Sequence, residues 1–162
     1  MNKKFSIVIP ILNEKKNIAI MVKKIKSSLR EFDYEIIFVD DDSKDGSDKV
    51  LNFLSKKNSR VKFIIRRNKK KDLSQACFDG IKKALYDVII IMDGDMQHDP
   101  INIKNMIYEI HKNNNLDLVI AVRNFNKKIL GMSLFRTHLS RLLILFISLF
   151  FGKKTLDPMS GF

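Results

Sequence analysis

Short apolar runs alternate with amphipathic segments along the first two-thirds of the chain. Runs rich in Val and Ile are typical of buried strands, and apolar residues spaced three or four apart are typical of helices. The pattern predicts strands at Phe5–Ile9, Tyr34–Val39, Val61–Ile65, Val88–Met92 and Asp117–Val122. It predicts helices at Glu14–Leu29, about Asp48–Lys57, near Leu73–Leu85, and Ile101–His111, with Asp99 as the cap and Pro100 at the first position of the last helix.

The order of these elements predicts an α/β fold. Strands that are apolar on both faces, separated by amphipathic helices, indicate a mostly parallel, Rossmann-like sheet with helices on both faces. In such sheets ligands bind beyond the carboxyl ends of the strands. The loops of interest are therefore Pro10–Glu14, Asp40–Ser47, Arg66–Asp72 and Asp93–Asp99.

The 162 residues suit a single domain, which we divide into residues 1–122 and 123–162 because the composition changes after Val122. Residues 123–162 carry seven basic residues and one acid, Asp157, around the apolar run Leu142–Phe151. That run is too short to span a bilayer, which takes about 20 apolar residues, so it is either a core helix or an interfacial one.

Charge and cysteine content limit the environment and the partners. The formal net charge of +12 predicts an anionic partner, either nucleic acid, a phospholipid surface or a phosphorylated substrate. The single cysteine, Cys77, excludes an intramolecular disulfide, and three scattered histidines offer no zinc-ligand spacing. The amino terminus does not resemble a signal peptide, so we expect a cytoplasmic location.

The segment IMDGDMQHDP places a polar cluster directly after an apolar strand. If the chain stays extended, Asp93, Asp95 and Gln97 point in one direction, because alternate residues of a strand share a face. Their oxygens would suit a hard cation, Mg²⁺ or Mn²⁺. The alternative is that Asp-Gly-Asp simply forms a turn.

A second acidic cluster, FVDDDSKDGS, also follows a predicted strand. One capping residue would be enough to start a helix, but Asp40, Asp41 and Asp42 stand side by side and repel one another. We therefore expect at least one carboxylate to meet a donor-rich partner such as a nucleobase edge or ribose hydroxyls. A third element, VIPILNE, ends the first strand at Pro10. The run Arg66–Lys71 is interpreted as a solvated loop.

Together with Arg123 and the closing DPMSGF, these motifs resemble family 2 glycosyltransferases of the GT-A fold, and within them the polyprenyl-phosphate group. The resemblance implies that Pro10, Asn13, Glu14, Asp40 and Asp41 bind the nucleotide of a nucleotide-diphosphate sugar donor. It implies that Asp93 and Asp95 are catalytic and, with Gln97, hold the Mg²⁺ or Mn²⁺ that bridges the donor diphosphate. Arg123 and Arg136 are expected to contact phosphates of the donor or the acceptor.

The activity implied is metal-dependent, inverting transfer of a sugar to a polyprenyl phosphate by an enzyme peripheral to the cytoplasmic membrane face. One alternative is a saccharide hydroxyl acceptor, for which Asp157 is a candidate base. Another is an inactive fragment that binds nucleotide-sugar. Nucleic acid is disfavoured as a partner, because the acidic loops would repel its backbone.

Three departures from the family pattern stand out. Asp42 occupies the usual glycine position of Asp-Asp-Gly-Ser, which matters if the backbone there needs a positive φ. Gly94 replaces the usual alanine, with no expected effect. Relatives continue past Ser-Gly-Phe, so we expect the chain to be truncated at its carboxyl end.

Overall fold

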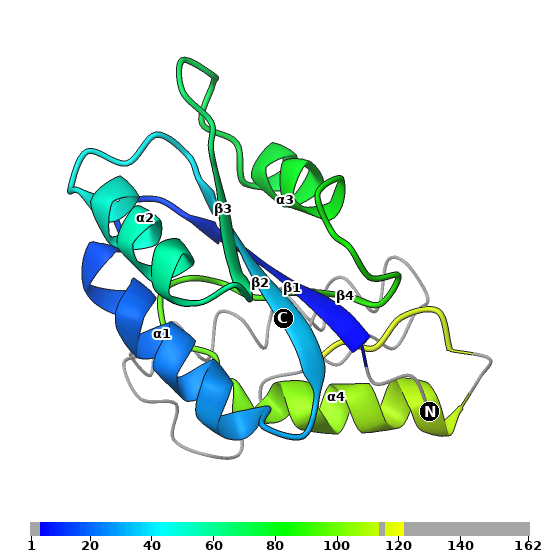
Figure 1. Ribbon diagram of the computed structural model, residues 1–162. Coiled ribbons are helices and arrows are strands. Elements are labelled where there is room, and N and C mark those ends of the chain that lie inside the picture. Colours follow the sequence, from blue (N-terminus) through cyan, green and yellow to red (C-terminus); the bar gives the residue numbers. More distant parts are fainter. Residues whose placement is uncertain (1–3, 114–115, 122–162) are drawn as a thin grey trace, which may run out of the picture. The chain divides into compact units, whose positions relative to one another are not determined.

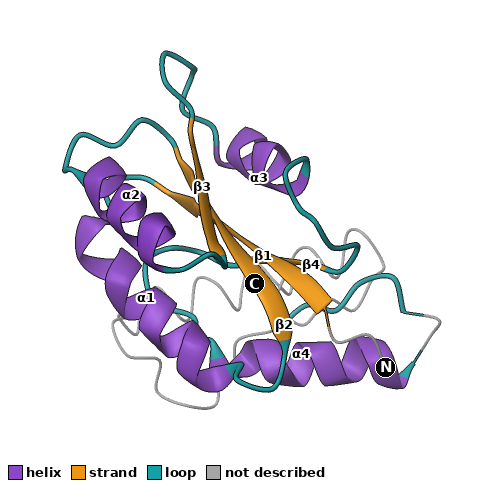
Figure 2. Ribbon diagram, in the orientation of Figure 1, coloured by secondary structure: helices purple, strands orange, loops and turns teal. Residues whose placement is uncertain are grey.

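The computed structural model describes residues 4–113 and 116–121, and the chain up to Val119 forms one compact unit. Its centre is a four-stranded sheet in the order β3-β2-β1-β4, with every neighbouring pair parallel (Figures 1 and 2). The strands are β1 (Lys4–Ile11), β2 (Asp33–Asp40), β3 (Val61–Ile65) and β4 (Ile89–Ile91). The prediction of an α/β fold with a parallel sheet is confirmed.

Helices cover both faces of the sheet, as predicted. They are α1 (Lys15–Ser28), α2 (Ser47–Lys57), α3 (Leu73–Ile81) and α4 (Ile101–Lys112). Helices α1 and α2 lie on one side of the sheet and α3 on the other (Figure 1). Helix α4 reaches the start of β2, where the Tyr108 ring meets the Phe32 ring edge-on.

Strand alternation divides the core between the two faces. Val8, Ile37 and Val39 pack with Ala76 of α3. The intervening strand residues Ile7, Ile9, Ile36 and Phe38 are also buried and point the other way, because alternate residues face opposite sides. The apolar face of the predicted helix Glu14–Leu29 is buried as well, at Ile18, Met21, Val22, Ile25 and Leu29. Both faces of the sheet are therefore filled by side chains that the periodicity identifies.

Helix α3 ends at Ile81, four residues before the predicted Leu85. From Lys83 on, the backbone amides no longer bond four residues back: Lys83 donates to Gly80 and Ala84 to Ile81, each at 3.0 Å. The next two amides bind side chains of the neighbouring strands. The Glu35 carboxylate accepts a hydrogen bond from the Leu85 amide at 2.6 Å, and the Ser6 hydroxyl accepts one from the Tyr86 amide at 3.2 Å. Because these amides are bound by side chains of the sheet, they cannot continue the helical pattern.

The predicted fifth strand, Asp117–Val122, is wrong for the residues that the structure describes, since residues 117–121 belong to no strand. Leu118 is 69% exposed and Ile120 is 53% exposed, so the apolar positions that suggested a buried strand are largely exposed. An apolar pattern becomes a strand only where a neighbouring strand supplies hydrogen-bond partners. The apolar pattern of a segment does not show whether such a neighbouring strand is present.

Within residues 4–113 and 116–121, no helix is both long enough and apolar enough to cross a membrane. The predicted apolar helix Leu142–Phe151 lies outside the described residues, as do Arg123, Arg136 and Asp157.

Candidate functional site

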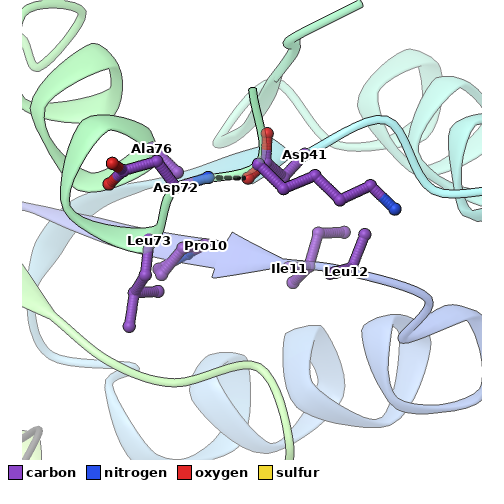
Figure 3. A pocket seen from close by; sticks show the side chains of 8 residues that line it. Pro10, Ile11, Leu12, Asp41, Asp72, Leu73 and Ala76 are labelled. Carbon is purple, nitrogen blue, oxygen red and sulfur yellow. Dashed lines mark hydrogen bonds between the residues drawn. The ribbon is translucent and has the colours of Figure 1, made fainter. Parts of the chain in front are cut away.

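A cavity of about 270 Å³ opens at the carboxyl ends of β1 and β2 (Figure 3). It is lined by Pro10, Ile11, Leu12, Asp41, Lys71, Asp72, Leu73 and Ala76. Apolar side chains form most of this lining, and the charged side chains of Asp41, Lys71 and Asp72 add polar groups. We call it the β1–β2 cavity. Such a site suits a ligand with one apolar face and a polar edge.

Asp41 is fixed at the edge of the β1–β2 cavity. Its carboxylate accepts a hydrogen bond from the Arg66 guanidinium at 2.6 Å on Oδ1, and one from the Asp72 amide at 2.7 Å on Oδ2 (Figure 3 shows the second bond). Its own amide donates to the Ile11 carbonyl at 3.0 Å. Each carboxylate oxygen has a second lone pair, so Asp41 can still accept hydrogen bonds from a ligand.

Arg66 is buried beneath the loop that walls this cavity, with only 3% of its surface exposed. Its Nε also donates to Asp79 at 3.1 Å, and its terminal nitrogens donate to the carbonyls of Asp72 at 3.1 Å and Lys70 at 3.4 Å. The prediction of a solvated loop is therefore wrong for Arg66, although residues 67–71 are exposed. The only signal in the sequence was its position directly after an apolar strand.

Asp40 and Asp42 face away from the β1–β2 cavity and line a second, polar cavity of about 310 Å³. Asp40 is fully buried, and its Oδ1 accepts the Ser43 amide at 2.9 Å. The pKa of Asp42 is lowered by the hydrogen bond from Lys44, 2.8 Å away, with Lys71 and Arg67 adding attraction. Each of the three aspartates thus accepts a hydrogen bond from a donor within the protein. A bound nucleobase is therefore not needed to offset the repulsion among their carboxylates.

The backbone at Asp42 has a φ of +60°. This is the left-handed region that favours glycine, so Asp42 stands where the family pattern has glycine for a conformational reason. Asp tolerates this region better than most residues.

Asn13 joins the loops after β1 and β2, Glu14 binds within the first turn of α1, and neither lines the β1–β2 cavity. The Asn13 amide donates to the Ser43 hydroxyl at 2.7 Å, and its side-chain oxygen accepts the Lys44 amide at 2.9 Å. Glu14 accepts a hydrogen bond from the Asn17 side chain at 2.6 Å. One further bond joins the loops, from the Lys15 amide to Asp45 at 2.9 Å. The loops after β1 and β2 are therefore tied to each other.

The segment of Asp93, Asp95 and Gln97 is a turn and not an extended chain, which corrects the geometry predicted from the sequence. Strand β4 ends at Ile91, Met96 has a φ of +65°, and the Gln97 amide donates to Asp95 at 2.9 Å. The three side chains therefore do not share a direction through strand alternation. A ligand that binds all three side chains would depend on the conformation of this turn.

The electrostatics of this turn favour a cation. Burial raises the pKa of Asp93, and the nearby Asp95 raises it further, while His98, 3.9 Å away, acts in the opposite sense. Among the described residues no Lys or Arg forms an ion pair with either aspartate. No cluster of three His, Cys, Asp or Glu able to hold a metal exists in this part of the chain. Two carboxylates fit Mg²⁺, which takes its other ligands from water and phosphate.

Gly94 brings this turn against the end of β1. A Cβ at Gly94 would lie 2.6 Å from Ile11 Cγ2 and 3.2 Å from the Pro10 carbonyl oxygen. The expectation that glycine has no effect here is therefore wrong, because alanine would clash with the strand. The close contact also places the turn beside two residues of the β1–β2 cavity.

Comparisons with a family model and with individual known proteins match this chain to the same kind of protein. Residues 6–159 match the family model described as Glycosyl transferase family 2. A dolichol-phosphate mannosyltransferase of Pyrococcus furiosus is 37% identical over 98% of this chain and 45% of its own length. One of Saccharomyces cerevisiae is 30% identical over 68% of this chain and 42% of its own length. The chain thus spans less than half the length of these relatives.

The structure of S. aureus TarS 1–349 superposes with a TM-score of 0.56 and 21% sequence identity, over 82% of this chain and 40% of that one. At this identity the similarity shows the fold alone. That fold agrees with the α/β architecture described above.

Proposed function

Because this chain belongs to glycosyl transferase family 2, we propose that it transfers a sugar from a nucleotide-diphosphate donor to a polyprenyl phosphate. The dolichol-phosphate mannosyltransferase names of its relatives support this acceptor class. The observation that carries the proposal is the β1–β2 cavity, with Asp41 fixed at its edge and the Asp93–Gln97 turn packed beside it through Gly94.

In this proposal the nucleoside occupies the β1–β2 cavity and the diphosphate extends toward the turn. Pro10 and Asp41 contact the nucleoside directly, since both line the cavity. Asn13, Glu14 and Asp40 contribute by shaping the loops. Arg123 and Arg136 are proposed to contact phosphates of donor or acceptor.

Asp93, Asp95 and Gln97 are the proposed ligands of Mg²⁺ or Mn²⁺. A bound divalent cation would supply Lewis-acid stabilisation of the negative charge on the departing diphosphate. Neither aspartate forms an ion pair with a Lys or Arg of the described residues, which supports a cation at this position. Asp93 and Asp95 are accordingly the proposed catalytic residues.

A polyprenyl phosphate is already an anion at neutral pH, so its attack on the sugar needs no general base from the protein. We propose that the reaction inverts the anomeric carbon, as expected for a single displacement. The acceptor is a lipid, and the net charge of +12 would attract the protein to an anionic membrane surface. The proposed location is the cytoplasmic face of a membrane.

Titration of the purified protein with GDP and UDP tests the donor site. We expect binding that strengthens with Mg²⁺ or Mn²⁺, and we expect Asp95→Asn to remove most of the metal effect. Asp87→Asn, which removes an exposed carboxylate before β4, is the matched control and should bind as the wild type does. Equal, metal-independent binding by wild type and Asp95→Asn would contradict the metal assignment.

Transfer is tested by incubating the protein with membranes and labelled nucleotide-sugar. Label in a lipid fraction that mild acid releases would support the polyprenyl-phosphate acceptor. Label in polysaccharide would indicate a saccharide hydroxyl instead. No incorporation, with donor binding intact, would favour an inert nucleotide-sugar-binding protein.

A further inference from the structure

We propose that Arg66 is a positioning residue for the donor site: it fixes both Asp41 and the 66–72 loop, and thereby gives the β1–β2 cavity its shape before a ligand binds. The inference rests on the proposed function for the identity of the ligand. The arrangement of Arg66 itself can be tested without any ligand.

The guanidinium of Arg66 joins three parts of the fold. It donates to Asp41 at the end of β2 at 2.6 Å, and to Asp79 on α3 at 3.1 Å. It also donates to the carbonyls of Lys70 and Asp72 within its own loop, at 3.4 Å and 3.1 Å. A planar group with five N–H donors in a fixed arrangement can hold several acceptors at once, which a lysine ammonium cannot do with the same directions.

The Arg66 guanidinium and the carboxylates that it binds are largely buried. The side chain of Arg66 is only 2% exposed, and those of Asp41 and Asp79 are 8% and 16% exposed. Asp79 would keep its bonds from Lys69 and Gln75 if the guanidinium were removed. Asp41 would keep only the bond from the Asp72 amide, and little water is available to replace the lost partner. We therefore expect Asp41 to move toward solvent and leave its place at the cavity edge.

Arg66 itself does not line the β1–β2 cavity, but two of its partners, Asp41 and Asp72, do. Asp41 lines it on one side, and Asp72 closes the loop through the bond from its amide to Asp41 Oδ2. Lys71 and Leu73, on either side of Asp72, also line the cavity. Arg66 thus acts on the ligand only through other residues, which makes it a positioning residue and not a catalytic one.

The first test measures nucleotide-diphosphate binding by calorimetry, with Mg²⁺ present, for Arg66→Lys and for the control Arg60→Lys. Arg60 stands just before β3, at the strand end opposite to Arg66. We expect Arg66→Lys to raise the Kd for GDP or UDP about tenfold or more with unchanged stoichiometry, and Arg60→Lys to change it less than about twofold. A role limited to global stability would instead lower the stoichiometry at unchanged Kd, and would overturn the proposal.

Asp79→Asn provides a second variant that is remote from the cavity. It weakens one anchor of Arg66 and touches no cavity residue, so we expect a higher Kd here as well. In an Asp41→Asn background the Arg66→Lys change should add little further loss, because its effect runs through Asp41. Fully additive losses, or an unchanged Kd in Asp79→Asn, would contradict the proposed role.

Hydrogen exchange in the ligand-free protein separates this inference from the proposed function. The Asp72 amide, which donates to Asp41, should be protected in wild type and Arg60→Lys and should exchange much faster in Arg66→Lys. Equal protection in all three proteins would overturn the positioning role. Absence of nucleotide binding by a wild-type protein that protects this amide would contradict the proposed function alone.

Discussion

Asp40, Asp41 and Asp42 follow one another in the chain, yet their carboxylates bind different partners because the strand ends between them. Asp40 bonds to its own loop, Asp41 to Arg66, and Asp42 to Lys44. The sequence shows three like charges, but only the fold shows that a buried guanidinium and an exposed ammonium lie within reach. Of the three, Asp41 alone lines the β1–β2 cavity.

Asp45 should make stability depend on pH in the acidic range. Burial tends to raise its pKa, but hydrogen bonds from Ser47 and from the Lys15 amide outweigh this and lower the pKa below its usual value. A depressed pKa contributes stability above the unfolded value, near pH 4, that is lost as the pH falls further. Urea unfolding should therefore show a constant deficit for Asp45→Asn from about pH 7 to 5 that shrinks below about pH 4.

Asp87→Asn, which removes an exposed carboxylate, is the control for this series. Its difference from wild type should be small at every pH. A deficit of Asp45→Asn that stayed constant down to pH 2 would show that the side-chain charge is not the source of the stability.

Gly94→Ala should destabilise the protein by about 1–3 kcal/mol, the usual cost of adding volume to a tight contact. The added Cβ would lie 2.6 Å from Ile11 Cγ2. Chemical unfolding measures the effect, and Ile11→Ala provides the matched background because it removes the clashing methyl group. Gly94→Ala should cost clearly less in that background, and equal costs in both would exclude this contact as the cause.

Site residues were predictable where a motif marks the end of a strand. They were not predictable where a residue's position depends on a hydrogen-bond partner that is distant in the sequence. Pro10 and Asp41 were predicted and line the cavity. Arg66 was missed because its run of basic residues looks solvated, while its burial depends on Asp79 of a later helix. For Asp95 and Gln97 the sequence left an extended chain and a turn open, and the turn forms because a local hydrogen bond competes with extension of the strand.

At the scale of elements, α3 packs on β1 and β2 at Gly80, a residue that has no side chain. A Cβ at Gly80 would lie 2.4 Å from Val8 Cγ1 and 3.0 Å from Val39 Cγ2. These strand residues are fully buried, so they have little room to adjust. The small residues of α3 thus let the helix approach the sheet closely.

Gly80→Ala should therefore lower stability, although alanine is the better helix former by about 1 kcal/mol. We expect the steric cost to win, with a net loss of about 1–3 kcal/mol in the free energy of unfolding. Ser74→Ala, at an exposed position of the same helix, is the control and should change stability by less than about 0.5 kcal/mol. A stabilised Gly80→Ala protein would contradict this packing.

Element boundaries were predictable where periodicity alone sets them. Helix α1 and strand β3 match their predicted bounds within one residue, because their apolar positions face a core. The segment after α3 is held by Glu35, which lies fifty residues earlier than the amide it binds. Residues 117–121 show the opposite failure, since they have the apolar pattern of a strand but belong to none.

At the scale of the whole molecule, the net charge of +12 makes a prediction about membranes. Each Lys or Arg near an anionic leaflet contributes about 1 kcal/mol, and salt screens this attraction. We expect the protein to sediment with vesicles that contain an anionic lipid and to be released as ionic strength rises. Neutral vesicles are the control, and binding to both kinds that is independent of salt would point to apolar contacts instead.

The hydrogen bonds that tie Asn13 to Ser43 and Lys44, and Lys15 to Asp45, have a consequence for the cost of binding. Two separate loops would each lose conformational entropy when a ligand orders them. Loops that are already joined by hydrogen bonds lose that entropy during folding. A ligand then binds to two loops that are already ordered. We therefore expect affinity at the β1–β2 cavity to depend partly on residues such as Asn13 that do not line it.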